Sequence, residues 1–182
     1  MRVPFPLSLR VGTDIIATGR ILCPVKPDQR RLVRLTKRYL HPSELYILER
    51  RFPAWKALES SSESQRRQLS GWLAGRWAAK EAAKKAWGAI HLSFTDLKVE
   101  TEIGGSVQIV CDVGRGSEDG SKSLPNDSNR VTEQIAQLSI SHDGDYTIAT
   151  VIATPLHTDI MTELAARKAK AEAKVSDMHD LA

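Results

Sequence analysis

The feature of the sequence that most limits the fold is a long helical stretch over residues 65–87. It is rich in alanine and contains no proline, and alanine has the highest helix propensity of all residues. A polar run at 60–64 precedes it as a hinge. From His91 onward the hydrophobic period changes to two, which is typical of strands. One long helix followed by a group of strands predicts an α+β domain, in which a short antiparallel sheet packs against that helix.

The strands of this sheet are predicted from alternating apolar residues and from the turns between them. The pair Gly104-Gly105 is typical of a hairpin turn, and residues 142–145 form a second polar turn. The predicted strands are residues 92–99, 107–111, 137–141 and 146–153.

The start of the chain allows two interpretations. Residues 5–11 alternate between apolar and other side chains, which predicts another strand. No acidic residue precedes Asp14, which also suits an organelle import segment. We favour the strand. Between it and the long helix we expect a basic amphipathic helix up to Leu40 and a second helix that Ser43 caps and that ends near Pro53.

Two segments are expected to lie outside the compact part of the chain. Residues 114–130 hold almost no apolar side chain and cannot offset the entropy of ordering, so they are predicted to form a flexible surface insert. Residues 156–182 are predicted to be a C-terminal helical tail that projects or frays. The main domain would then cover residues 1–155.

The charge of the chain is divided unevenly. Residues 1–90 carry 18 basic and 7 acidic side chains, whereas residues 91–182 carry 8 and 15. A positive half suggests phosphate or an acidic protein surface as the partner. Cys23 and Cys111 lie in no disulfide or zinc pattern, which indicates a reducing, intracellular compartment. No apolar run approaches the roughly 18–20 residues of a membrane span, so we expect no membrane association.

The long helix also carries the strongest candidate for chemistry. Four-residue steps place Glu81 and Lys85 on one strip, and Arg76, Lys80 and Lys84 on another. A carboxylate and an ammonium one turn apart can act together on a phosphate, the first through a metal ion and the second directly. The alternative is a solvated helix face with ordinary ion pairs.

Two other residues extend this candidate site. Asp14 follows a predicted strand and a glycine, where a carboxylate can enter a cleft, although a turn or cap aspartate is the alternative. His142 stands at the end of a strand before an Asp-Gly turn, where a histidine is commonly structural.

Taken together, the order and separation of these segments resemble a known family. The chain is similar to the holo-acyl-carrier-protein synthases, the small group of 4′-phosphopantetheinyl transferases, over roughly residues 5–153. The segments that carry the resemblance are GTDIIATGRI at 12–21, LHPSE at 40–44, LAGRWAAKEAAKKAWG at 73–88, LSFTDLKV at 92–99 and LSISHDGDY at 138–146.

The resemblance implies the 4′-phosphopantetheinyl transferase fold and an Mg²⁺-dependent reaction. The phosphopantetheine arm of coenzyme A would pass to a serine of an apo acyl carrier protein, with release of adenosine 3′,5′-bisphosphate, as in fatty acid biosynthesis. Asp14 and Glu81 match the family's metal-binding carboxylates, and Lys85 matches its lysine on the attacked phosphate. For coenzyme A and for the carrier the resemblance suggests two further sets of residues: Ser141, His142, Arg66 and Arg76 for the coenzyme, and Arg20, Arg30 and Arg34 for the carrier.

The resemblance further implies a homotrimer with sites between subunits, and it favours the mitochondrion over the cytosol. One departure is the segment after Lys85, AWGAIHLSF, which is shorter and poorer in glycine than is common in the family. The alternative function is a non-enzymatic basic module for nucleic acid or an acidic protein. Such modules interleave exposed aromatics with basic residues, whereas residues 20–38 contain none, so we expect the enzyme and no nucleic acid partner.

Overall fold

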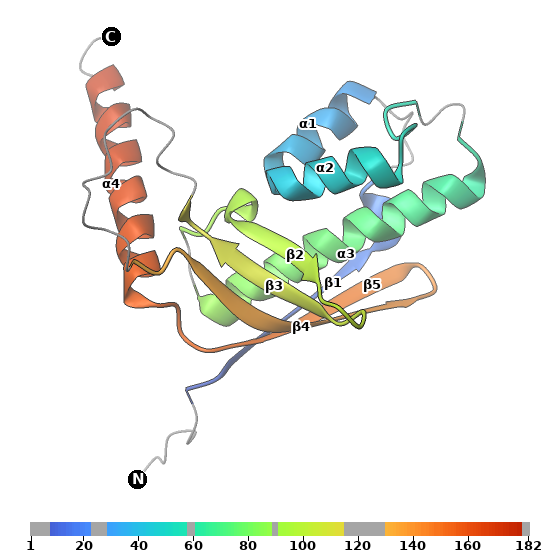
Figure 1. Cartoon of the computed structure of the whole chain (residues 1–182). Coiled ribbons are helices and arrows are strands. Elements are labelled where there is room, and N and C mark those ends of the chain that lie inside the picture. Colours follow the sequence, from blue (N-terminus) through green and yellow to red (C-terminus); the bar gives the residue numbers. More distant parts are fainter. Residues whose placement is uncertain (1–7, 23–28, 58–60, 89–90, 115–129, 180–182) are drawn as a thin grey trace.

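The structure is a computed structural model that describes residues 8–22, 29–57, 61–88, 91–114 and 130–179. Its elements follow the chain as helices first and strands afterwards, apart from one N-terminal strand and one C-terminal helix (Figure 1). They are β1 (Arg10–Ala17), the 3₁₀ helix η1 (Thr18–Arg20), α1 (Gln29–Tyr39), α2 (Pro42–Arg51), α3 (Glu63–Trp87), the 3₁₀ helix η3 (Phe94–Asp96), β2 (Leu97–Thr101), β3 (Val107–Asp112), β4 (Glu133–Asp143), β5 (Tyr146–Ala153) and α4 (Thr158–His179).

The strands form one antiparallel sheet in the order β1-β5-β4-β3-β2. The long helix α3 packs on one face of this sheet, and the α1–α2 pair lies on the far side of α3 (Figure 1). Alanines on α3 and alternate residues of the strands fill the core between them, and their side chains are nearly inaccessible. The predicted α+β domain with a short antiparallel sheet against a long helix is confirmed.

The contact between β1 and α3 is unusually close. A Cβ atom on Gly12 would overlap the Ala82 carbonyl oxygen and would lie 2.5 Å from the Ala86 amide nitrogen. Glycine is therefore required here, because any side chain would push strand and helix apart. This contact sets Asp14, two residues further along the same face of β1, beside the last turns of α3.

The first strand begins later than the sequence pattern predicts. We expected residues 5–11 and placed Asp14 after the strand, but β1 runs to Ala17 and Asp14 pairs with Ala149 inside the sheet; residues 1–7 lie outside the described part. Aspartate is depleted in strands, so propensity argues against this position. The alternation decides it, because Ile16 is buried against the helix whereas Ile15 faces outward.

The strand predicted at 92–99 is also wrong in its first half. Asp96 Oδ2 accepts the Ser93 N–H at 2.9 Å, and Ser93 Oγ accepts the Thr95 N–H at 3.3 Å, so residues 94–96 turn as η3 before β2 begins. Local side-chain hydrogen bonds of this kind compete with a strand ladder. By contrast, the hairpin at Gly104-Gly105 is as predicted, since both residues have positive φ.

We expected the C-terminal helix to project from the domain or to fray, but the first turns of α4 pack against the core. Ile160 and Leu164 of α4 are buried in the core. Arg167 donates hydrogen bonds to Asp96 Oδ1, at 3.0 Å, and to the Val113 carbonyl oxygen. The first turns of α4 thus anchor η3 and the end of β3. Most of the predicted insert, residues 115–129, lies outside the described residues.

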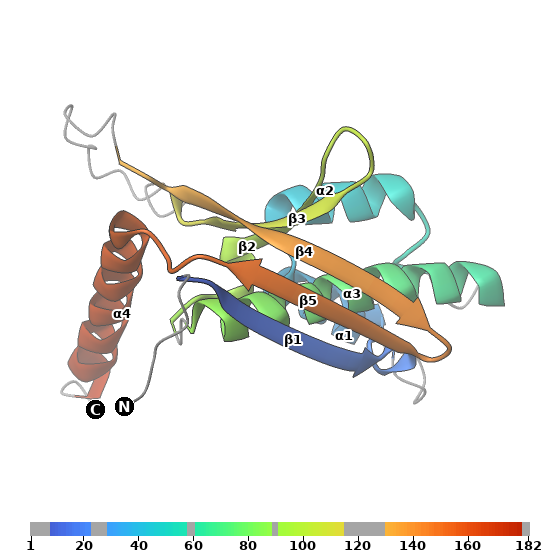
Figure 2. The ribbon, with the colours of Figure 1, turned by 90° about the horizontal axis from the view of Figure 1, so that it is seen from below.

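The outer face of the sheet is exposed and carries several large apolar side chains among polar ones. None of the described helices covers it in the view of Figure 2. Its exposed large side chains come from three strands and include Val11, Ile15, Ile135, Tyr146, Ile148 and Ile152. In the described part of the chain, no helix is both long and apolar enough to cross a membrane.

Candidate active site

Lys85 and Asp14 meet where β1 crosses α3. The Lys85 ammonium donates to Asp14 Oδ1 and to the Thr13 carbonyl oxygen, both at 2.8 Å. Lys85 is half exposed, while the Asp14 carboxylate is mostly covered. The structure therefore brings together two of the three predicted catalytic residues, Asp14 and Lys85. The two residues are 71 positions apart in the sequence.

Glu81 lies one turn before Lys85 on α3 and is partly buried. Within the described residues it forms no hydrogen bond or ion pair, so its carboxylate oxygens are available to a ligand. The same residues contain no group of three or more His, Cys, Asp or Glu side chains that could hold a metal ion. A pair of carboxylates still fits Mg²⁺, which prefers oxygen ligands and is completed by waters and substrate phosphates.

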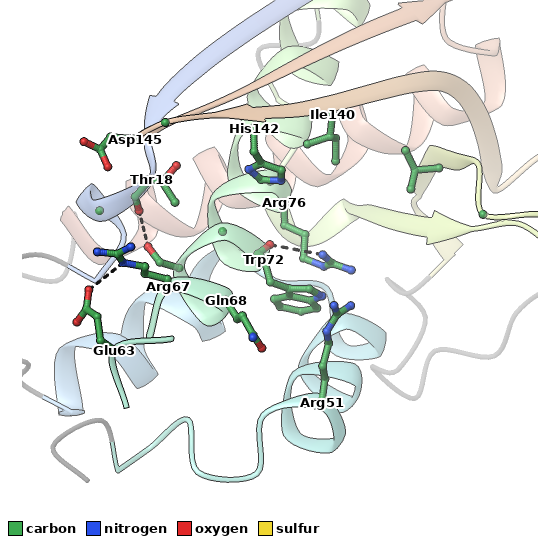
Figure 3. A pocket seen from close by; sticks show the side chains of 17 residues that line it. Thr18, Arg51, Glu63, Arg67, Gln68, Trp72, Arg76, Ile140, His142 and Asp145 are labelled. Carbon is green, nitrogen blue, oxygen red and sulfur yellow. Dashed lines mark hydrogen bonds and ion pairs between the residues drawn. The ribbon is translucent and has the colours of Figure 1, made fainter. Parts of the chain in front are cut away.

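A pocket of about 930 Å³ lies further toward the start of α3 (Figure 3). It is bounded by η1, by the N-terminal half of α3 and by the turn between β4 and β5. Its lining includes the cationic side chains of Arg51, Arg67 and Arg76. Of these, Arg67 pairs with Glu63 at 3.0 Å. Glu63 and Asp145 also line the pocket, so the three guanidinium groups outnumber the carboxylates by one. Guanidinium groups at a concave surface suit phosphate groups.

Arg76 is the best-held cation of the pocket. Its guanidinium carbon lies 3.5 Å from the centre of the Trp72 ring, and Nη1 donates to the Trp72 carbonyl oxygen at 3.4 Å. Burial lowers the pKa of Arg76 to about 10, while the carboxylate of Glu44 raises it. Arg76 is therefore still a cation at neutral pH. Figure 3 shows the Arg51 and Arg76 side chains both reaching to Trp72, one from α2 and one from α3.

His142 enters the pocket from β4. Its Nδ1 is hydrogen-bonded to the Thr147 hydroxyl at 2.8 Å, which fixes the orientation of the ring. Gly71 and Gly75 face it from α3, and a Cβ atom on either would come within about 4 Å of the ring carbon Cε1. The two glycines thus leave the imidazole room at the pocket wall.

Two residues predicted for coenzyme binding lie elsewhere. Ser141 is exposed on the opposite face of β4 from His142, because neighbouring residues of a strand point to opposite sides. Arg66 does not line the pocket, and its Nη2 lies 3.6 Å from Glu63 Oε2. The next residue, Arg67, lines the pocket instead.

Three pocket residues were missed from the sequence, namely Trp72, Arg51 and Arg67. The four-residue spacing of Trp72 and Arg76 was a usable signal, since it stacks the two side chains on one helix face. Arg51 had no such signal, because it comes from the end of α2, a different element.

The predicted site residues fall into two groups along α3. Asp14, Glu81 and Lys85 do not line the pocket that holds Arg76 and His142. The three residues predicted to meet the carrier are all exposed: Arg20 at the end of η1, and Arg30 and Arg34 on α1.

Comparison with known proteins identifies the family. The model of the 4′-phosphopantetheinyl transferase superfamily matches residues 10–151. The chain belongs to this superfamily. The transferase is 36% identical over 162 residues to the mitochondrial 4′-phosphopantetheinyl transferase B of Aspergillus fumigatus, an alignment that covers 83% of this chain and 97% of that protein. The holo-[acyl-carrier-protein] synthase of Streptococcus thermophilus is 32% identical and aligns with 70% of this chain and 83% of its own.

Among solved structures, the holo-acyl-carrier-protein synthase of Plasmodium yoelii matches with a TM-score of 0.50 at 20% identity. The match covers 81% of this chain and 95% of that one, and it shows the shared fold. The predicted resemblance to holo-acyl-carrier-protein synthases is confirmed. The transferase is thus an enzyme and not the non-enzymatic basic module that was the alternative.

Proposed function

We propose that the transferase moves the 4′-phosphopantetheine group of coenzyme A to a serine of an apo acyl carrier protein and releases adenosine 3′,5′-bisphosphate. The observation that carries this proposal is the Asp14–Lys85 contact beside Glu81. In a chain of this superfamily, two carboxylates and a lysine along one helix–strand contact supply the charges that phosphoryl transfer needs.

The chemistry assigns a role to each of these residues. Asp14 and Glu81 would hold Mg²⁺, which when bound compensates negative charge on the pyrophosphate of the coenzyme. The Lys85 ammonium donates to the non-bridging oxygens of the attacked phosphate. The serine oxygen forms the new bond to phosphorus as the pyrophosphate bond breaks, and adenosine 3′,5′-bisphosphate leaves. Glu81 is the candidate acceptor of the serine proton.

The pocket at Arg76 and His142 would bind the remaining phosphates of coenzyme A. Three guanidinium groups line it, and guanidinium groups bind phosphates with paired N–H donors. We add Arg51 and Arg67 to the coenzyme-binding residues on this ground.

The transferase would act as a homotrimer. The large apolar side chains exposed on the outer face of the sheet support this, because exposed patches of this kind mark protein interfaces. The separation of Asp14 and Glu81 from the pocket supports it as well. In an assembly, the carboxylate site of one subunit could face the pocket of its neighbour.

The exposed basic residues Arg20, Arg30 and Arg34 would recruit the carrier protein. Opposite charge speeds encounter and fixes orientation without taking part in the phosphoryl step. We place the reaction in mitochondrial fatty acid biosynthesis; the mitochondrial relative from Aspergillus fumigatus supports this location.

The proposed reaction can be tested by mass spectrometry. The transferase is incubated with coenzyme A, Mg²⁺ and an apo acyl carrier protein, and the carrier is then weighed. We expect its mass to rise by one phosphopantetheine group, and not to rise when its acceptor serine is replaced by alanine. An unchanged carrier mass at full incubation would refute the proposal.

A further inference from the structure

Glu44 is a fully buried carboxylate that does not line the pocket. It stands in the first turn of α2. Its Oε2 accepts hydrogen bonds from the Lys80 ammonium at 2.5 Å and from the His41 backbone N–H at 2.9 Å. Its Oε1 accepts the Val99 backbone N–H at 3.0 Å and lies 3.7 Å from Arg76 Nε. One carboxylate therefore joins α2, α3 and β2.

This carboxylate compensates two cations that lie one turn apart on α3. Lys80 is fully buried, and its other two bonds go to the carbonyl oxygens of Tyr39, at 2.6 Å, and Phe94, at 3.1 Å. Burial lowers the pKa of Lys80 to about 8, and the charge of Arg76 acts in the same direction, whereas Glu44 raises it. Without Glu44, two poorly solvated cations would face each other, which is strongly unfavourable.

Glu44 also limits where the Arg76 guanidinium can lie. The Trp72 ring covers one face of the guanidinium, and Glu44 lies along the Nε edge. Arg76 Nε is buried and has no hydrogen-bond partner among the described residues, and Glu44 Oε1 lies 3.7 Å from it. Arg76 Nη1 also donates to the Trp72 carbonyl oxygen, in a long hydrogen bond of 3.4 Å. Without the charge of Glu44, the Trp72 ring and this long bond would be left to hold the guanidinium at the pocket wall.

We infer that Glu44 is a positioning residue: it holds Arg76 in place against Trp72 and so sets the affinity of the pocket for the phosphates of coenzyme A, which it does not touch. The inference rests on the proposed function, in which Arg76 binds the coenzyme. A positioning role differs from a purely structural role of Glu44 in what a substitution changes. A structural role would change the stability of the protein and would leave its affinity for coenzyme A unaltered.

A double-mutant cycle on the full-length transferase tests this inference. Glu44→Gln keeps the size of the side chain and removes its charge. By titration calorimetry, we expect this change to raise the Kd of coenzyme A about tenfold, because Arg76 is then less firmly held at the pocket wall. Arg76→Gln is expected to raise it as well. In the Arg76→Gln background, Glu44→Gln should change the Kd by less than about twofold, because the two residues act as a unit.

Lys80→Met is the matched control, since it removes a partner of the same carboxylate but leaves Glu44 beside Arg76. It is expected to lower Tm and to leave the Kd of coenzyme A unchanged. The inference is overturned if Glu44→Gln weakens binding equally with and without Arg76, if it leaves the Kd unaltered, or if Lys80→Met weakens binding as much as Glu44→Gln does.

Two further measurements keep the test decisive. If Glu44→Gln does not fold, Glu44→Asp takes its place, because it keeps the charge but withdraws it from Arg76: a raised Kd of coenzyme A that is absent in the Arg76→Gln background supports the inference, and an unaltered Kd overturns it. Inorganic pyrophosphate serves as a second probe. Binding of pyrophosphate with the same Glu44 and Arg76 dependence, but no binding of coenzyme A, would refute the proposed function while supporting the role of Glu44.

Discussion

Replacement of Gly12 by alanine should separate β1 from α3 and disable the site at the same time. The added Cβ would overlap the Ala82 carbonyl oxygen and approach the Ala86 amide nitrogen to 2.5 Å. An ordinary contact needs at least 3.4 Å and the Ala82 carbonyl oxygen would lie at 2.0 Å, so strand and helix must move apart by about 3.4 − 2.0 = 1.4 Å at that point. Overpacking of this kind costs about 1–3 kcal/mol, and we expect a loss of stability at the upper end of that range, because both obstacles are backbone atoms.

The same displacement should affect activity more than stability. Asp14 follows Gly12 on the same face of β1 and bonds to Lys85 of α3. A shift of about 1 Å between reacting groups can cost about 100-fold in rate. Urea unfolding gives the loss of stability, and the rate of carrier modification at a temperature where the variant is folded gives the loss of activity.

Gly19→Ala is the control for this prediction. No atom lies within 4 Å of a Cβ built on Gly19, so this variant should match the unaltered protein in stability to within about 0.5 kcal/mol. A Gly12→Ala variant that is as stable as Gly19→Ala and as active as the unaltered protein would refute the reasoning, since it would mean that the close contact of β1 and α3 is not needed.

Three more predictions concern single side chains. Lys85→Ala should lower kcat by about 100-fold or more, as expected for an electrostatic contact with the reacting phosphate. Lys84→Ala should have a small effect on kcat, because the Lys84 ammonium lies over the Phe94 ring, 4.7 Å from its centre. Equal effects of the two changes in a steady-state assay would show that Lys85 is not the lysine of the site. Burial raises the pKa of Cys111 from 9.0 to about 12, so only the unfolded thiol ionises between these values, and the free energy of unfolding should fall by about 1.4 kcal/mol per pH unit above pH 9. Cys111→Ala should remove this part of the slope in urea unfolding at pH 7–10, and an unchanged slope would contradict it. Arg20→Glu should raise the KM for the carrier, flatten its dependence on salt and leave the KM for coenzyme A unchanged; a loss confined to coenzyme A would assign Arg20 to the other substrate.

The elements that the sequence predicts well are those with a strong local pattern. Helix α3 and strand β5 have a clear period over many residues, and β5 was predicted with its observed bounds. The pattern could not place the end of β1, because Gly12 and Asp14 disfavour a strand locally and are held in it by the pairing with β5 and the contact with α3. Nor could the pattern detect η3, because residues 92–99 alternate like a strand while side-chain hydrogen bonds of Ser93 and Asp96 turn the chain before β2 begins.

The residues of the candidate site also differ in how far a local sequence pattern reveals them. Glu81 and Lys85 were found because four-residue spacing on one helix is visible in the sequence. Asp14 and His142 were candidates from their places at the ends of predicted strands, and the resemblance to a family gave them their roles. Glu44 was not predicted as a site residue, since its partners Arg76 and Lys80 on α3 and Val99 on β2 lie 32 or more residues away in the sequence, up to 55 for Val99. Long-range charge pairing of this kind depends on the folded chain.

The central claim is that Glu81, with Asp14 and Lys85, forms the site of phosphopantetheine transfer. Its most direct test is the rate of carrier modification by Glu81→Ala, followed by mass spectrometry over a range of Mg²⁺ concentrations, with Tm measured on the same sample. Loss of charge compensation worth several kcal/mol should reduce the rate by about 100- to 1,000-fold while Tm stays close to that of the unaltered protein. A folded Glu81→Ala transferase that modifies the carrier at a near-normal, Mg²⁺-dependent rate would contradict the account.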